Sequence, residues 1–255
     1  MGELLGQLPR PEGGRLAWRR IDGRGPTVVW LGGFRSDMSG TKAQALADWA
    51  VRSRRAFLRF DYSGHGESAG DFAEGTIGRW REDALAAVDK LVPGPLVLVG
   101  SSMGGWLACL LALARPERVQ GLVLIAPALD FTEALMWPAL SEEARRSLEQ
   151  DGYWMQPSEY GPPYPLTQAL FEDGRRWSLL PGPIRITAPV RILQGARDPD
   201  VPWTHAIKLV DALESADVAF TLVKDGDHRL STPADLQRLE AAAEELAAMA
   251  ERPSR

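Results

Sequence analysis

Residues 96–114 read LVLVGSSMGGWLACLLALA, which is an apolar run, a glycine-rich turn and a second, longer apolar run. The turn contains Gly100-Ser101-Ser102-Met103-Gly104, a G-x-S-x-G pattern between a predicted strand and a predicted helix. A turn this sharp forces its central residue into a strained conformation, and the flanking glycines avoid clashes with their neighbours. The segment therefore predicts a strand–turn–helix unit that exposes the Ser102 hydroxyl above the end of a strand.

Strand and helix patterns alternate along most of the chain. Short apolar runs rich in β-branched residues predict strands, and apolar residues at helical spacing predict the helices between them. The predicted strands are 27–31, 56–60, 96–99, 122–125, 190–193 and 219–223, and the predicted helices are 41–52, 77–91, 103–114, 203–213 and 233–250. Residues 15–21 predict an antiparallel hairpin strand at an edge. This alternation is typical of an α/β fold whose mostly parallel sheet carries helices on both faces.

The stretch between residues 126 and 190 interrupts this alternation. It contains one predicted charged helix, 142–150, no clear strand, and many prolines and aromatic residues. The aromatic residues include Trp137, Tyr153, Trp154, Tyr160, Tyr164, Phe171 and Trp177. A structureless loop of this length is uncommon in a compact domain, so we expect a small helical cap over the sheet. The predicted organisation is a core of residues 1–130 and 187–255 with a cap insertion of residues 131–186.

Three histidines are available to activate the serine. A serine hydroxyl is a weak nucleophile until a base removes its proton. Where the nucleophile sits in a strand–turn–helix unit of this kind, the acid and then the histidine follow it along the chain. His228 comes after the last predicted strand and before the last helix, so it is the predicted base. His65 precedes the serine in a predicted turn, and His205 lies in a predicted helix.

The predicted acid is Asp198, which follows the strand 190–193 in the loop GARDPDVP. Catalytic and binding residues of α/β proteins gather in the loops at the carboxyl ends of the strands. Asp200, in the same loop, and Asp130, after the preceding strand, are the alternatives. The acid would orient the imidazole and stabilise the imidazolium.

Two backbone N–H groups are expected to form an oxyanion hole. One is that of Met103, the residue after the nucleophile, and the other that of Phe34 in the loop Gly32-Gly33-Phe34-Arg35. The neighbouring Arg35 could attract a substrate carboxylate or could simply be solvated.

Composition excludes several classes of function. The net charge is −5, and no cluster of Lys and Arg exceeds two consecutive residues, so we expect no nucleic-acid partner. The single cysteine, Cys109, and three scattered histidines predict neither disulfides nor a metal site, and we expect no cofactor. The longest apolar run, 106–114, is far shorter than the roughly 20 residues of a membrane span. The first residues lack a secretory signal, so we expect a cytoplasmic protein without stable membrane insertion.

The chain resembles the α/β-hydrolase superfamily, and within it the branch of palmitoyl-protein thioesterases and mycophenolic acid acyl-glucuronide esterases. The matching segments are residues 40–43 (GTKA), 59–64 (RFDYSG), 100–102 (GSS) with 104–106 (GGW), 114–117 (ARPE), 201–203 (VPW) and 227–229 (DHR). Trp154, Pro157, Ser158 and Tyr160 of the insertion also match. One departure is the loop 32–38 (GGFRSDM), where the family has a Pro-Gly-Tyr opening, so the wall of the acyl pocket differs. We also find no match to the family's organelle-targeting segment, so we expect a bacterial or cytosolic relative.

The resemblance implies that Ser102 is the nucleophile, Asp198 the acid and His228 the base. It implies a serine hydrolase that cleaves carboxylic esters or thioesters through an acyl-enzyme, with a small molecule or an acylated protein as substrate. A peptidase or carbon–carbon bond hydrolase of the same fold, and a non-catalytic ligand-binding member, are the alternatives.

Overall fold

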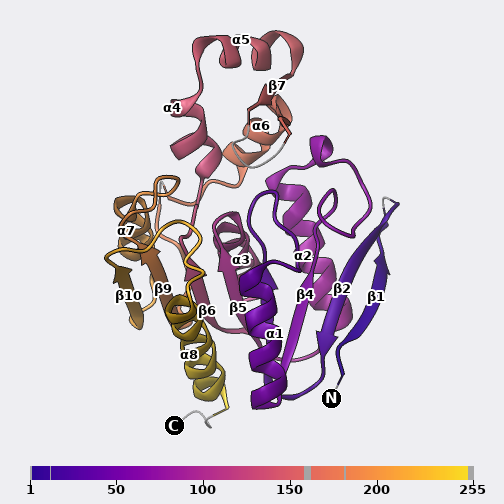
Figure 1. Cartoon of the computed structure of the whole chain (residues 1–255), viewed down its shortest axis with the longest axis vertical. Coiled ribbons are helices and arrows are strands. Elements are labelled where there is room, and N and C mark those ends of the chain that lie inside the picture. Colours follow the sequence, from indigo (N-terminus) through magenta and orange to yellow (C-terminus); the bar gives the residue numbers. More distant parts are fainter. Residues whose placement is uncertain (1, 12, 158–161, 181, 252–255) are drawn as a thin grey trace.

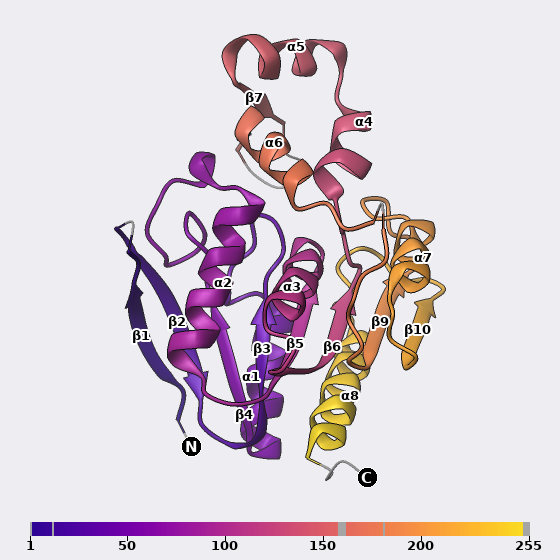
Figure 2. The ribbon, with the colours of Figure 1, turned by 180° about the vertical axis from the view of Figure 1, so that it is seen from behind.

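The computed structural model describes residues 2–11, 13–157, 162–180 and 182–251. Eight strands form one sheet in the order β1-β2-β4-β3-β5-β6-β9-β10 (Figures 1 and 2). The strands are β1 (Leu4–Pro9), β2 (Arg15–Ile21), β3 (Arg24–Leu31), β4 (Arg55–Phe60), β5 (Leu96–Ser101), β6 (Val119–Ile125), β9 (Val190–Gly195) and β10 (Val218–Val223). β2 is antiparallel to both β1 and β4, and all other pairs are parallel. The predicted mostly parallel sheet is confirmed.

Helices cover both faces of this sheet. α1 (Thr41–Ser53) and α8 (Pro233–Ala250) pack on one face, and α2 (Ile77–Leu91), α3 (Met103–Ala114) and α7 (Trp203–Ala212) pack on the other (Figures 1 and 2). The central strands serve both layers because alternate side chains of a strand point to opposite faces. In β5, Leu96 and Leu98 belong to the core under α3, whereas Val97 and Val99 belong to the core under α8.

The insertion stands above the carboxyl ends of the parallel strands (Figures 1 and 2). It comprises a π-helix, η2 (Thr132–Met136), then α4 (Trp137–Ala139), α5 (Glu142–Asp151), the hairpin of β7 (Tyr153–Gln156) and β8 (Tyr164–Thr167), and α6 (Gln168–Arg176). Ser141 caps α5 by accepting a hydrogen bond from the Ala144 N–H, and Gly152 ends it in the left-handed conformation. The Trp106 indole donates to the Trp177 carbonyl at 3.1 Å, so α3 of the core holds the end of the insertion.

The structure corrects three sequence predictions. Residues 15–21 form a strand, but the edge of the sheet is β1, whose short LLGQLP segment is mostly exposed and lacks clear alternation. The expected absence of strands in the insertion is wrong, since β7 and β8 pair there. Each has only four residues and β8 contains Pro165, so neither gives a strong strand pattern. Helix α6 was also not predicted, because it is short and contains Gly174. Ser158 and Tyr160 lie outside the described residues.

Candidate active site

Ser102 occupies the sharp turn between β5 and α3. Its φ of 55° and ψ of −119° confirm the strained backbone expected from the motif. A Cβ on Gly100 would lie 2.2 Å from the Gly104 carbonyl oxygen, and a Cβ on Gly104 would lie 2.0 Å from the Leu31 carbonyl oxygen. Both glycines are therefore required for the backbone to pass this closely, and the tight turn raises Ser102 above the sheet.

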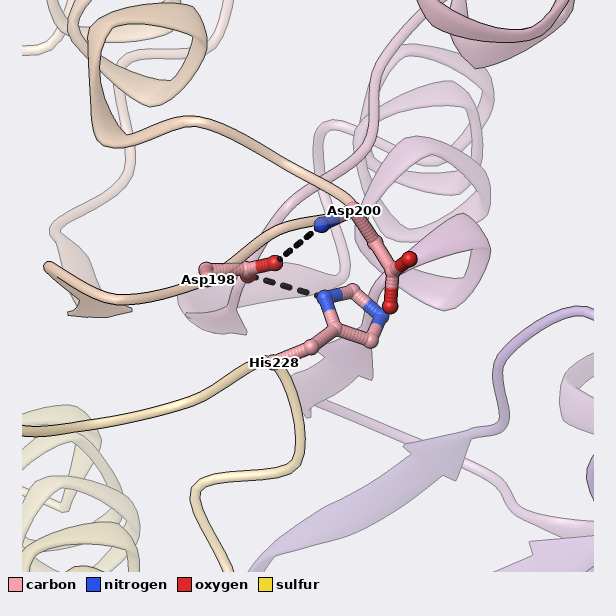
Figure 3. A group of neighbouring side chains, drawn as sticks. All are labelled: Asp198, Asp200 and His228. Atoms are coloured by element: carbon pink, nitrogen blue, oxygen red, sulfur yellow. Dashed lines mark hydrogen bonds and ion pairs between the residues drawn. The ribbon is translucent and has the colours of Figure 1, made fainter. Parts of the chain in front are cut away.

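The structure brings Asp198 and His228 together at the carboxyl ends of β9 and β10 (Figure 3). His228 Nδ1 donates to Asp198 Oδ2 at 2.8 Å. The other Asp198 oxygen accepts from the backbone N–H groups of Asp200 at 2.9 Å and Val201 at 2.8 Å. The buried Gln194 amide also donates to Asp198, at 3.2 Å. These bonds fix the carboxylate and direct His228 Nε2 away from it, which is the orientation that a general base requires.

Neither alternative acid makes a hydrogen bond to His228 within the described part of the chain. Asp130 accepts from the Ser178 hydroxyl at 2.7 Å and from the backbone N–H groups of Leu179 and Leu180, both at 2.9 Å. Asp130 therefore holds the segment that returns from the insertion to the core. The Asp200 carboxylate lies on the side of the His228 ring opposite its contact with Asp198 (Figure 3).

Ser102 reaches the same edge of the sheet from β5, with β6 between β5 and β9. No hydrogen bond joins the Ser102 hydroxyl to His228 among the residues that the structure describes. Hydrogen bonds of catalytic groups are often long without substrate and shorten in the complex. The geometry therefore combines a fixed aspartate–histidine pair with a serine in a strained turn at the same edge.

The loop before α1 lies against Ser102. A Cβ on Gly33 would lie 3.4 Å from Ser102 Cβ and 3.3 Å from the Ser101 carbonyl oxygen. The next backbone N–H, that of Phe34, and the N–H of Met103 donate no hydrogen bond to another described residue. Both predicted oxyanion donors thus flank Ser102 with their N–H groups available to a ligand.

His65 and His205 are buried and bonded to backbone groups rather than to an acid. His205 Nε2 donates to the Leu129 carbonyl at 2.8 Å, and His65 Nδ1 donates to the Ser63 carbonyl at 3.2 Å. Burial lowers the pKa of both imidazoles. Both therefore stay neutral at pH 7, and each donates to a backbone carbonyl, whereas His228 donates to a carboxylate.

Asp198, Asp200 and His228 each offer a ligand atom within 4.8 Å of the others. This is the group of potential metal ligands that the described residues contain. Asp198 already accepts four hydrogen bonds, one of them from the His228 ring. Binding an ion through these oxygens would disrupt that network, so we interpret the group as an acid–base pair with Asp200 beside it.

A pocket of about 350 Å³ opens inside the insertion. It is lined by Met136, Ala139, Leu140, Ser141, Ala144, Trp154, Gln156, Pro157, Tyr164 and Leu166. Tyr164 also faces the core, where its ring lies 6.0 Å from that of Phe34 and stacks under the Arg35 guanidinium at 3.9 Å. The side chain of Tyr164 therefore separates the pocket from the loop beside Ser102.

Sequence reasoning did not identify three residues of this region. Gln194 supports Asp198, Tyr164 joins the insertion to the loop 32–36, and the Lys42 ammonium donates to the Arg229 carbonyl beside His228 at 2.5 Å. A polar Gln194 at the end of an apolar strand was the available signal, because a buried polar group needs a partner. Lys42 was noted only within the GTKA match.

Comparison with known proteins identifies the family. The profile described as serine aminopeptidase, S33 (Hydrolase_4) matches residues 26–168. The mitochondrial palmitoyl-protein thioesterase ABHD10 of Bos taurus is 39% identical over 234 residues, which cover 91% of this chain and 76% of that protein. The human protein of the same name is 38% identical over 92% of this chain and 77% of its own length.

Solved structures agree. A protein from Agrobacterium vitis S4 described as a hydrolase superposes with a TM-score of 0.92 at 45% identity, covering 97% of this chain and 100% of its own. Mouse α/β hydrolase domain-containing protein 10 gives a TM-score of 0.88 at 38% identity, covering 96% and 99%. The chain therefore has the α/β-hydrolase fold, as its resemblance predicted. It belongs to the family described as serine aminopeptidase, S33.

The expected cytoplasmic location is wrong by the same comparison. Five curated relatives, from cattle to human, are named as mitochondrial proteins, and this finding overturns the expectation. The expectation depended on the lack of a recognisable leader, and that lack does not determine a compartment. Separately, no helix among the described residues is long and apolar enough to cross a membrane.

Proposed function

We propose that this chain hydrolyses acyl thioesters and carboxylic esters, with Ser102 as nucleophile, His228 as base and Asp198 as acid. The observation that carries the proposal is the 2.8 Å bond between His228 and a fully buried Asp198 carboxylate, at the sheet edge where the strained Ser102 is presented. The kinship with palmitoyl-protein thioesterases supports acylated substrates.

The reaction divides into two steps. His228 Nε2 removes the Ser102 proton while Oγ attacks the acyl carbon, and the N–H groups of Phe34 and Met103 stabilise the resulting oxyanion. Collapse of the tetrahedral intermediate breaks the bond to the leaving group. The proton on His228 passes to that group or, where a thiolate departs, to solvent, so that His228 is again a free base. Water, deprotonated by His228, then attacks the acyl-enzyme and releases the acid and Ser102.

Thioesters suit this site because a thiolate leaves readily, its conjugate thiol having a pKa of about 8.5. An alkoxide or amine depends far more on the proton from His228. We therefore expect good hydrolysis of thioesters and activated esters and poor hydrolysis of amides.

The acyl chain would enter the pocket within residues 131–186, which we propose as the cap. This pocket has mostly apolar walls and lies across Tyr164 from the loop beside Ser102. Its volume of about 350 Å³ is at the small end of the range for small-molecule sites. Each methylene that it buries contributes about 0.8 kcal/mol, so kcat/KM should rise with chain length until the pocket is full.

The test is the turnover of acyl thioesters and matched p-nitrophenyl esters from acetyl to palmitoyl by wild type and Ser102→Ala. Loss of a serine nucleophile lowers kcat by about 10⁶-fold in the enzymes where it is known, and we expect a comparable loss. Purified Ser102→Ala that keeps a tenth of the wild-type rate would contradict the proposal. Ser101→Ala is the matched control, because it changes the adjacent buried serine.

One observation favours a second function. The matching family profile is described as a serine aminopeptidase, so peptide hydrolysis by the same residues is the alternative. Aminoacyl p-nitroanilides, compared with acyl thioesters on one enzyme preparation, distinguish the two. A higher kcat/KM for the anilides would replace the thioesterase proposal with a peptidase.

A further inference from the structure

We infer that His65 is a positioning residue for the oxyanion hole, holding the loop that carries the Phe34 N–H through a hydrogen bond to the next residue. His65 Nε2 lies 3.3 Å from the backbone nitrogen of Arg35. The inference rests on the proposed function, because that function uses the Phe34 N–H as an oxyanion donor.

The partners of His65 determine its tautomer. The Ser63 carbonyl oxygen can only accept, so Nδ1 at 3.2 Å carries the proton and donates it. The Arg35 N–H can only donate, so Nε2 must be free of a proton and accept. Only a neutral imidazole with the proton on Nδ1 makes both bonds.

The ring itself is held in place from several sides. It lies 5.6 Å from Tyr62, 5.3 Å from Phe72 and 5.2 Å from Trp80, measured between ring centroids, and each pair is close to perpendicular. The Trp80 indole donates to the same Ser63 carbonyl that accepts from His65. An acceptor fixed in this way defines where the Arg35 N–H can lie.

The loop needs such a restraint because its backbone is strained. Arg35 has a φ of 59°, in the left-handed region that non-glycine residues rarely occupy. The Arg35 guanidinium packs on the Tyr164 ring of the insertion. Arg35 is therefore held twice, by its side chain on Tyr164 and by its backbone N–H on His65. Strained residues with several restraints are a feature of functional sites.

Residues 61–65 also hold the two ends of this loop. The Tyr62 hydroxyl donates to the Gly32 carbonyl at 3.4 Å, and the Met38 N–H donates to the Asp61 carboxylate at 2.7 Å. The Phe34 N–H shares its peptide with the Gly33 carbonyl, which accepts from the Ser36 N–H and hydroxyl within the same loop. The bond between His65 and the adjacent Arg35 N–H ties this turn to residues 61–65. Its loss would let the Phe34 N–H move away from the developing oxyanion while the ends of the loop stay in place.

A matched pair of variants separates positioning from packing. Gln at position 65 can place its amide oxygen where Nε2 lies and so accept from Arg35. Asn at position 65 reaches only the Nδ1 position and cannot. We expect His65→Asn to lower kcat by about tenfold to a hundredfold, part of the 10²- to 10³-fold loss that removing an oxyanion donor causes. KM for a short p-nitrophenyl ester should stay within about twofold, because the oxyanion forms only in the transition state.

His65→Gln should keep most of the wild-type kcat. A trifluoromethyl ketone, which forms an oxyanion on the nucleophile, should lose affinity for His65→Asn by the same factor as kcat/KM. Equal rates for the Asn and Gln variants, or a change confined to KM, would overturn the inference.

A measurement on the wild-type protein keeps the inference testable if the variants do not fold. Histidine labelled with ¹⁵N should show, for His65 at pH 7, a protonated Nδ1 and an unprotonated Nε2. A proton on Nε2 would overturn the inference. Ser102→Ala separates the two proposals: a rate that survives this change refutes the proposed function, whereas a Ser102-dependent rate unaffected by His65→Asn refutes only the role of His65.

Discussion

Two regions are built by different means: the edge of the core sheet formed by the carboxyl ends of its parallel strands, and the insertion above that edge. At the edge, backbone atoms fix the geometry: Gly104 passes too close to Leu31 to tolerate a Cβ, and two backbone N–H groups hold Asp198. The insertion is held to the core mainly by side chains, such as Asp130, Trp106 and Tyr164. Backbone geometry is insensitive to most substitutions, whereas side-chain contacts change with each one. From this difference we propose that the edge determines the chemistry and the insertion determines the substrate.

Asp198→Asn, a change at the edge of the sheet, should produce the largest loss of kcat among these variants. The amide would present a donor to His228 Nδ1 and favour the wrong tautomer, which lowers kcat by about 10⁴-fold in a comparable triad. Steady-state kinetics on a short activated ester measures this loss directly.

Asp200→Asn and Asp130→Asn are the matched controls, since neither side chain bonds to His228. Each should cost far less than Asp198→Asn. If Asp130→Asn lowers kcat as much as Asp198→Asn does, then a residue that holds the insertion is needed for the chemistry. That result would contradict the division of roles between the two regions.

Trp154→Ala should produce a smaller and different effect. Trp154 lines the pocket in the insertion, so its loss should enlarge the acyl site and move the optimum of kcat/KM to longer chains. A lost methylene contact of about 0.8 kcal/mol corresponds to about fourfold in kcat/KM. The rate on acetyl p-nitrophenyl ester should hardly change, because the chemistry lies elsewhere.

Tyr153→Ala is the control for Trp154, because Tyr153 is its neighbour on β7 but is 50% exposed. Its chain-length profile should match that of wild type. If Trp154→Ala also keeps the wild-type dependence of kcat/KM on chain length, the pocket in the insertion does not select the acyl chain.

The last expected effect is on stability rather than on activity, and it concerns the core alone. Burial lowers the pKa of His205 below its ordinary value of 6.5, so below about pH 6.5 the unfolded chain binds more protons than the folded one. Stability should therefore fall as the pH drops from 6.5, by up to about 1.4 kcal/mol per pH unit for each such histidine. The free energy of unfolding, measured with urea between pH 5 and 7, should depend less steeply on pH in His205→Gln than in wild type. An identical pH dependence would mean that folding does not shift the pKa of His205.

The same contrast explains what could be predicted from the sequence. The turn at Ser102 was predictable because strand runs and the G-x-S-x-G turn are local patterns. The pairing of Asp198 with His228 was predictable because an acid and then a histidine follow such a turn along the chain. The strands of the insertion were not, because β7 and β8 are short and depend on pairing with each other. The hydrogen bond of His65 to Arg35 joins two loops 30 residues apart, which no local pattern reveals. Sequence placed His65 correctly in a turn but could not show what its ring contacts.

The most direct test of the account is to identify the residue that becomes acylated. The protein would be reacted with a fluorophosphonate and, in a second sample, with a palmitoyl thioester quenched in acid, then digested and analysed by mass spectrometry. The account predicts one adduct per chain on Ser102 in both samples, and none on Ser102→Ala. An adduct on Ser101 or on another residue, or turnover without any adduct at Ser102, would contradict it.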